Sequence, residues 1–128
     1  MRIYPQGNRE YVYNGRFTGP VQLEMIIEAP DATQDDIARV HCTDGAVTFW
    51  HSHPGGQVLM LLSGTGRVGT GDGEHRGIEP GTVVETPPGE PHWHGADDGH
   101  DAVWLAITRG VTDWTDQPPV ESSWAGHR

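Results

Sequence analysis

The chain has little of several things that define large classes of proteins. Its 128 residues include one cysteine, Cys42, so no disulfide can form within the chain, and a reducing compartment fits. Only 8 Lys and Arg stand against 18 Asp and Glu, which gives a net charge of −10 with neutral histidine. Such a surface repels phosphate backbones and anionic lipids. We therefore expect neither a nucleic acid nor a membrane among its partners.

Long apolar runs are also missing. No run approaches the ~20 apolar residues that cross a membrane as a helix, and the first five residues lack the apolar core of a signal peptide. No segment shows long helical periodicity either. These absences predict a cytoplasmic protein, and a chain of this length is expected to form a single domain over 1–128.

Short apolar runs separated by glycine and proline are what the chain does contain. They predict strands at 21–27, 37–43, 47–53, 58–62, 67–70, 82–86, 92–94 and 102–108. Asp44-Gly45 is a typical hairpin turn, which would pair the second and third of these strands. Frequent turns between short strands predict an all-β sandwich or barrel. The tail from Gly110 has no periodicity, so it either packs over one end of the barrel or is partly loose.

Two histidine-containing stretches carry the chemistry. His51 and His53 are two residues apart, so on a strand both side chains point to one face. Gln57 follows after a Pro-Gly-Gly corner and can come level with them, and His92 lies in a second turn-rich stretch. Imidazole is the commonest protein ligand for transition metals. The same alternation places Phe49 on the inward face with the histidines.

Both stretches resemble motifs of the cupin superfamily. The first motif is matched by His51, His53, Gln57 and Gly64, and the second by Gly81, Pro87, Gly89 and His92. The resemblance covers residues 38–108, with an N-terminal arm at 1–37 and a tail at 109–128 outside it. It implies a double-stranded β-helix, the jelly-roll barrel of cupins, with a metal inside.

Two departures from the usual motifs indicate which subgroup of cupins the chain resembles. Gln57 stands where most cupins have Glu, and Ala96 where they have Asn. This variant is similar to small bacterial cupins that include manganese-dependent hydroxynitrile lyases. The resemblance implies metal ligands at His51, His53, Gln57 and His92. It implies manganese first, and iron, nickel, cobalt and zinc stay open.

The substrate pocket is also expected from this resemblance. Ala38 and Val40 match positions that line the lyase pocket. Trp104 stands where the lyases carry a histidine, the probable base, and Thr108 where they carry a glutamine. Core packing is as good an interpretation of Trp104 and Thr108 as substrate contact. With Phe49, these four residues form the predicted pocket.

Neutral ligands suggest the kind of reaction. Without a carboxylate ligand, the metal keeps its full charge and is a stronger Lewis acid. We therefore predict redox-neutral lyase or isomerase chemistry on a small carbonyl or hydroxyl compound, with His94 or a metal-bound hydroxide moving the proton. Two alternatives stay open: a dioxygenase that cleaves a C–C bond or an alkene, and a cupin that binds a small molecule without turnover. For His94 itself, a place in solvent is the competing interpretation.

The remaining expectations concern surfaces. Val58, Met60 and Leu62 face away from Gln57 on their strand and form an apolar stripe, which predicts a homodimer. Trp50 and Trp93 alternate with the histidines and are expected to point away from the metal. The other histidines are expected near the surface: His41, His75, His100 and His127.

Overall fold

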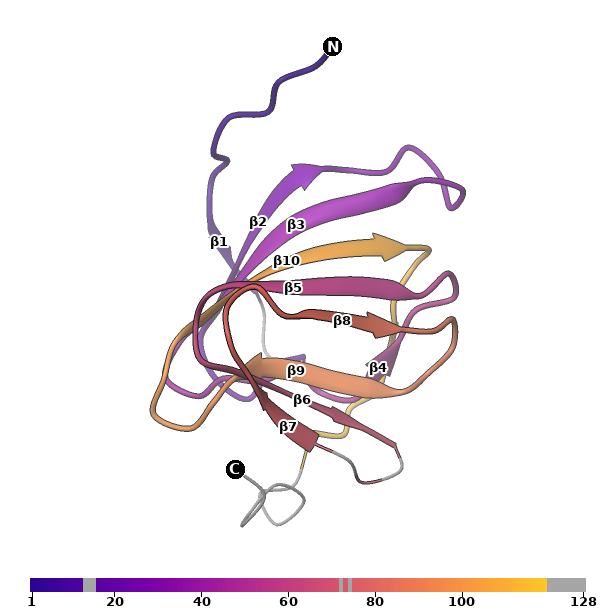
Figure 1. The fold of residues 1–128 in the computed structure, drawn as a ribbon. Helices are drawn as coiled ribbons and strands as arrows, with labels where there is room; N and C mark the ends of the chain where they lie inside the picture. Colours follow the sequence, from indigo (N-terminus) through magenta and orange to yellow (C-terminus); the bar gives the residue numbers. More distant parts are fainter. Residues whose placement is uncertain (13–15, 72, 74, 120–128) are drawn as a thin grey trace.

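Two antiparallel sheets pack face to face in the computed structural model (Figure 1), which describes residues 1–12, 16–71, 73 and 75–119. The six-stranded sheet has the order β1 (Glu10–Tyr11), β2 (Val21–Ile27), β3 (Asp35–Cys42), β10 (Ala102–Arg109), β5 (Gln57–Gly64) and β8 (Val83–Thr86). The five-stranded sheet has the order β11 (Asp113–Trp114), β4 (His51–Ser52), β9 (His92–Ala96), β6 (Gly66–Thr70) and β7 (His75–Ile78). The described residues contain no helix, and the predicted all-β jelly roll is confirmed. None of them therefore forms a helix that could span a membrane.

Strand alternation explains the core. On β5, Leu59 and Leu61 point between the sheets and are almost fully buried, and Trp104 on β10 is fully buried beside them. Burying each such side chain stabilises the fold by about 1.5–3 kcal/mol. The indole N–H of Trp104 donates to the Gly95 carbonyl at 3.0 Å, so its polar group is satisfied. Gly66 lets the ring approach, because a Cβ there would lie 2.6 Å from it.

The turn predicted at Asp44-Gly45 exists, but the strands before and after it do not pair with each other. The predicted hairpin is therefore wrong. Asp44 and Gly45 have φ of 50° and 76°. The chain then crosses to the other sheet, where Val47 forms a bridge with Gly95. Strand β3 pairs with β2 and β10 instead. A turn signal reverses the chain locally, but burial between the sheets decides which strands pair.

The inward position predicted for Phe49 is also wrong. Regular strand geometry begins only at His51, so alternation cannot be counted back from it. Thr48 lines the cavity between the sheets, and Phe49 is half-buried outside it. The backbone N–H of Phe49 donates to the Arg16 carbonyl at 2.7 Å.

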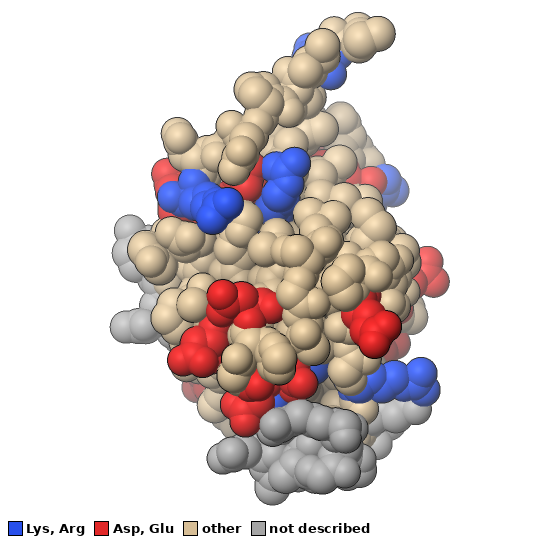
Figure 2. All heavy atoms as spheres, turned by 60° about the vertical axis from the view of Figure 1, so that its left-hand side comes forward, with Lys and Arg blue, Asp and Glu red and all other residues tan. Residues whose placement is uncertain are grey.

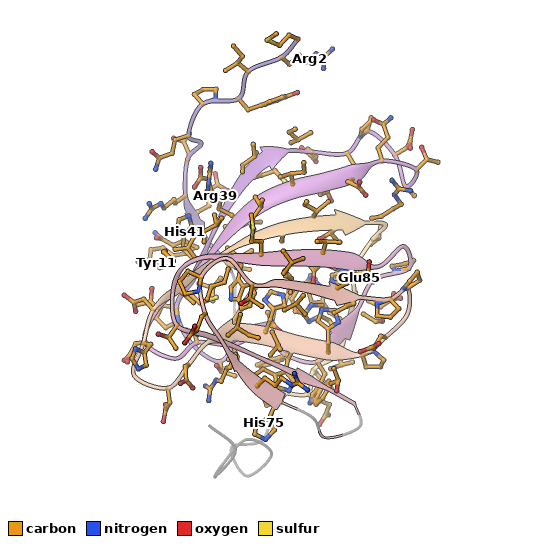
Figure 3. The ribbon with its side chains drawn as sticks, in the orientation of Figure 1. Arg2, Tyr11, Arg39, His41, His75 and Glu85 are labelled. Carbon is orange, nitrogen blue, oxygen red and sulfur yellow. The ribbon has the colours of Figure 1, made fainter. Side chains whose placement is uncertain are left out.

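A buried carboxylate lies on the outer face of the six-stranded sheet. Glu24 is fully buried and accepts hydrogen bonds from Arg39 at 2.7 Å and from the backbone N–H of Gly7 at 2.9 Å. His41 Nε2 lies 3.1 Å from its other oxygen. Burial opposes ionisation, but the hydrogen bonds and the charge of Arg39 hold the pKa of Glu24 below its usual value. Figure 3 shows Arg39 and His41 beside the N-terminal arm.

This cluster corrects one expectation about the histidines. His41, predicted near the surface, is only 9% exposed. The alternation of β3 does turn it away from the core, but the N-terminal arm and Glu24 cover it. His127 lies outside the described residues. On the face drawn in Figure 2, basic side chains near the arm lie beside acidic ones, a larger acidic group lies further down, and another basic group lies at the lower right.

Candidate metal centre

Three histidines converge between the sheets. One ring nitrogen from each of His51, His53 and His92 lies within 4.8 Å of the others, and all three residues are buried. Strand pairing causes this convergence, because β4 and β9 are antiparallel neighbours with His51 opposite His92. His53 follows His51 at the end of β4. A cluster of three buried imidazoles could hold a metal ion, which is the kind of site that the sequence predicts.

The hydrogen bonds of Nδ1 in His51 and His92 show which ring nitrogen is free to bind a metal. Nδ1 of His51 lies 2.8 Å from the Phe49 carbonyl oxygen, and Nδ1 of His92 lies 3.0 Å from that of Glu90. A carbonyl can only accept, so each neutral ring carries its hydrogen on Nδ1. Nε2 then presents a lone pair to the centre. Such outer hydrogen bonds orient metal-binding histidines in general.

His53 is held differently. Its Nδ1 lies 3.0 Å from the hydroxyl of Thr112. Its Nε2 is buried and has no hydrogen-bond partner in the part of the chain that the structure describes. A buried nitrogen without a partner is costly, and a cation at the centre would satisfy it.

Gln57 reaches the three histidines from the opposite sheet. Its side-chain Nε2 donates to the hydroxyl of Thr108 at 2.9 Å, across the pair that these residues form between β5 and β10. Its Oε1 then lies 3.0 Å from Nε2 of His92. Because that nitrogen carries a lone pair, two acceptors face each other, which a cation between them would stabilise. With the amide turned over, Gln57 would instead donate to His92, the arrangement we expect without a metal.

Burial keeps the ligands uncharged. Burial, with a smaller contribution from the nearby His92, lowers the pKa of His51 to about 3 and that of His53 to about 4. The pKa of His92 is lowered by burial as well. At neutral pH all three imidazoles are therefore neutral and able to bind. With the amide of Gln57 they form four uncharged donors, which suit a divalent transition metal.

His94 lies beside this centre and outside the three-histidine cluster. It is 3% exposed, lines the cavity and has its ring centroid 5.5 Å from that of His51. Its Nδ1 has no hydrogen-bond partner among the described residues. Burial holds the pKa of His94 well below its usual value, so it is neutral at pH 7. The same burial makes His94 a weaker base than a free imidazole, and its Nδ1 has almost no accessible surface toward the cavity.

A cavity of about 250 Å³ opens beside the histidines. Its wall is largely apolar and includes Leu23, Met25, Ala38, Val40 and Ala106. Among the predicted pocket residues, Ala38, Val40 and Thr108 line it. Trp104 does not, because it is fully buried in the core behind His94, with ring centroids 5.9 Å apart. Arg16 and Asp36 are the charged residues of the lining.

Two residues that contact the clustered histidines come from the tail and were not predicted. Thr112 contacts His53, and the indole of Trp114 lies 4.6 Å from the ring of His51, centroid to centroid. The tail adds β11 to the edge of the five-stranded sheet, with Trp114 opposite His51. The guanidinium of Arg16 lies over the same indole at 5.1 Å. The only signal in the sequence was an aromatic residue in an otherwise polar segment.

Comparison with known proteins agrees with this geometry. The Cupin_2 model, described as a cupin domain, matches residues 38–108. A curated relative, the (R)-mandelonitrile lyase of Granulicella tundricola, is 44% identical over 80 residues, which are 62% of this chain and 61% of that protein. The chain thus matches somewhat less than two thirds of that relative's length.

Solved structures extend the likeness to nearly the whole chain. A cupin-like protein from Thermotoga maritima has a TM-score of 0.82 and 30% identity, covering 97% of this chain and 95% of that one. A polyketide cyclase from Streptomyces resistomycificus, with a TM-score of 0.73 and 18% identity over 92% and 89% of the two chains, shares the fold. With the two motifs, the buried histidines and the paired sheets, these matches show that the chain belongs to the cupin family.

Proposed function

We propose that this cupin is a metal-dependent lyase that carries out redox-neutral chemistry on a small carbonyl or hydroxyl compound. The observation that carries the proposal is a set of four uncharged donors, His51, His53, His92 and Gln57, beside an apolar cavity. The similarity to a mandelonitrile lyase supports it. A divalent metal held there would supply Lewis acidity toward a substrate oxygen.

The residues around the cavity have separate tasks in this proposal. The apolar wall of Ala38, Val40 and Ala106 binds the body of the substrate and excludes water. His94 takes the proton of a substrate hydroxyl and returns it to the leaving group. In a cyanohydrin, this would release a carbonyl compound and hydrogen cyanide. A volume of about 250 Å³ limits the substrate to a small molecule.

The proton carrier cannot be the same as in the lyases that the sequence resembles. Trp104 occupies the position of their histidine, and its only polar group donates to the Gly95 carbonyl. An indole has no basic nitrogen. His94 is therefore the basic side chain that we assign to the cavity wall.

Manganese is the first candidate for the metal, from the resemblance, and iron, nickel, cobalt and zinc also accept nitrogen and oxygen donors. The test begins with metal analysis of the purified protein. The protein reconstituted with Mn(II) is then screened against aliphatic and aromatic cyanohydrins and β-hydroxy carbonyl compounds, with an oxygen electrode in the same cell.

Each outcome of the screen separates one hypothesis from the others. Product formation without oxygen uptake supports the lyase. Oxygen uptake in step with substrate loss would replace it with the dioxygenase alternative. Tight binding of the screened compounds with no turnover would favour a binding protein.

A further inference from the structure

The segment that follows β10 is fixed beside the metal ligands at both of its ends. At its start, the Arg109 carbonyl accepts from Gly55 N–H at 3.0 Å. At its end, Thr115 N–H donates to the Trp50 carbonyl at 3.0 Å. Gly110, at φ 87°, turns the chain against Pro54. Backbone contacts thus determine where the residues between these ends lie.

Thr112 lies between these anchors and contacts a metal ligand. Its hydroxyl oxygen is 3.0 Å from Nδ1 of His53, and the residue also lines the cavity. His51 and His92 are held by backbone carbonyls, which always accept. A hydroxyl can accept or donate, so the tautomer of His53 depends on what Thr112 does.

We propose that Thr112 is a positioning residue: its hydroxyl accepts the Nδ1 hydrogen of His53 and so keeps Nε2 free for a metal. The inference rests on the metal centre of the proposed function. If Thr112 donated instead, the ring hydrogen would move to Nε2, which is buried and faces the other histidines and Gln57 at the centre. A protonated Nε2 cannot bind a metal.

The hydroxyl can be removed with little change of shape. Thr112→Val keeps the volume but leaves the Nδ1 hydrogen without an acceptor, and the other tautomer becomes competitive. Loss of such an outer contact typically weakens metal binding about 10- to 100-fold. Thr112→Ser keeps the hydroxyl and is expected to avoid this loss of metal affinity.

A matched control lies three residues away. Thr115 belongs to the same segment, and its hydroxyl donates to the Trp50 carbonyl at 2.8 Å without touching a ligand. Thr115→Val makes the same chemical change and is expected to leave metal affinity unchanged. Circular dichroism and thermal unfolding check that each variant is folded. Thr112→Ala replaces Thr112→Val if the valine does not fit.

The experiment uses Zn(II), which is diamagnetic. Zinc affinity is measured by competition with a chromophoric chelator, and the ring nitrogens of 15N-labelled histidine are followed by NMR. In the zinc-loaded protein, His53 is expected to show a protonated Nδ1. Thr112→Val is expected to lose affinity 10- to 100-fold and to shift this signal, whereas Thr112→Ser and Thr115→Val do neither.

The failures are distinguishable. An unprotonated Nδ1 of His53 in the zinc-loaded protein overturns the inference without any variant. Equal zinc affinity of Thr112→Val and the unchanged protein overturns it too, and leaves the metal centre in place. Failure of the unchanged protein to bind zinc, manganese, iron, cobalt or nickel would overturn both this inference and the proposed function.

Discussion

The two sheets face each other across the cavity with different chemistry. The five-stranded sheet brings the histidines: His51 on β4, His53 at its end, and His92 and His94 on β9. The six-stranded sheet brings the apolar wall and a single neutral donor, Gln57. One sheet would therefore bind the metal, and the other would set the size of the substrate and the charge left at the centre. Mutations in the five-stranded sheet should therefore affect metal binding, and mutations in the six-stranded sheet should affect the reaction.

The largest effect on metal binding is expected from mutations in the five-stranded sheet. His51→Ala combined with His53→Ala removes two of four donors, and we expect complete loss of metal. The barrel should still fold, because Leu59, Leu61 and Trp104 supply its core independently of the site. Metal analysis and circular dichroism test both statements. Stoichiometric metal in the double variant would refute the assignment of the centre.

In the metal-free protein, acid should lower the free energy of unfolding through the histidines of the five-stranded sheet. Burial lowers the pKa of His51 to about 3 and of His53 to about 4, whereas an unfolded chain takes up these protons near pH 6.5. Below about pH 6.5 the unfolded state binds protons that the folded state excludes, so the free energy of unfolding falls until the folded pKa values are reached.

The size of this acid effect follows from the same linkage. We expect a loss of about 2 kcal/mol per histidine by pH 5, measured by urea unfolding between pH 7.5 and pH 5. The His51→Ala, His53→Ala variant should lose correspondingly less over the same range. Equal acid sensitivity of the two proteins would show that these histidines are not buried in their neutral form.

A negative charge introduced on the six-stranded sheet tests whether Gln57 sets the charge at the metal centre. Gln57→Glu adds a carboxylate to the donor set, so the metal should bind more tightly and oxidise more easily in air. A charge a few ångströms away is worth on the order of 4 kcal/mol at an effective dielectric of about 20. Even a fraction of this would lower a lyase rate about tenfold or more.

Ser63→Glu is the matched control for this change, because it adds the same charge to the exposed end of the same strand. Both variants are loaded with Fe(II) or Mn(II), and metal oxidation and turnover are followed together. If Gln57→Glu oxidises no faster than the control and keeps the full lyase rate, Gln57 does not govern the chemistry.

The outer face of the six-stranded sheet should affect assembly and leave the site almost unchanged. Val58 and Met60 are half-buried there, and Leu62 and the neighbouring Val83 are 39% and 58% exposed. We propose that this face pairs with a second copy of the chain. Sedimentation should give about twice the 14.0 kDa of one chain, and Met60→Asp should give monomers with unchanged metal content. A monomer at micromolar concentration before mutation would refute the pairing.

The convergence of His51, His53 and Gln57 is predictable from sequence where local geometry determines it. His51 and His53 share a strand face by alternation alone, and the Pro-Gly-Gly corner returns the chain to Gln57. Ala38 and Val40 line the cavity because β3 is regular over its whole length. Phe49 was misplaced because the chain before β4 is irregular.

Contacts that depend on distant pairing were not predictable. Asp44-Gly45 correctly marks a turn, but the partner of β3 is chosen by burial against β2 and β10. Thr112 and Trp114 reach the site because the tail adds a strand to the edge of β4. A two-residue strand carries no periodicity, so nothing local could have predicted their position.

The buried carboxylate of Glu24 should make the rate of amide hydrogen exchange uneven along the N-terminal arm. Residues around Gly7 are mostly exposed, and exposed backbone normally exchanges its amide hydrogens quickly with solvent. The amide of Gly7 donates to the Glu24 carboxylate, which is fully buried while the arm is in place, and releasing the amide would break a charge-assisted hydrogen bond. Its hydrogen should therefore exchange with deuterium far more slowly than those of its neighbours in the sequence. Ahead of β1, which is itself paired with β2, one protected amide would fix residues 1–9 at a single point, with the residues before Gly7 free to move.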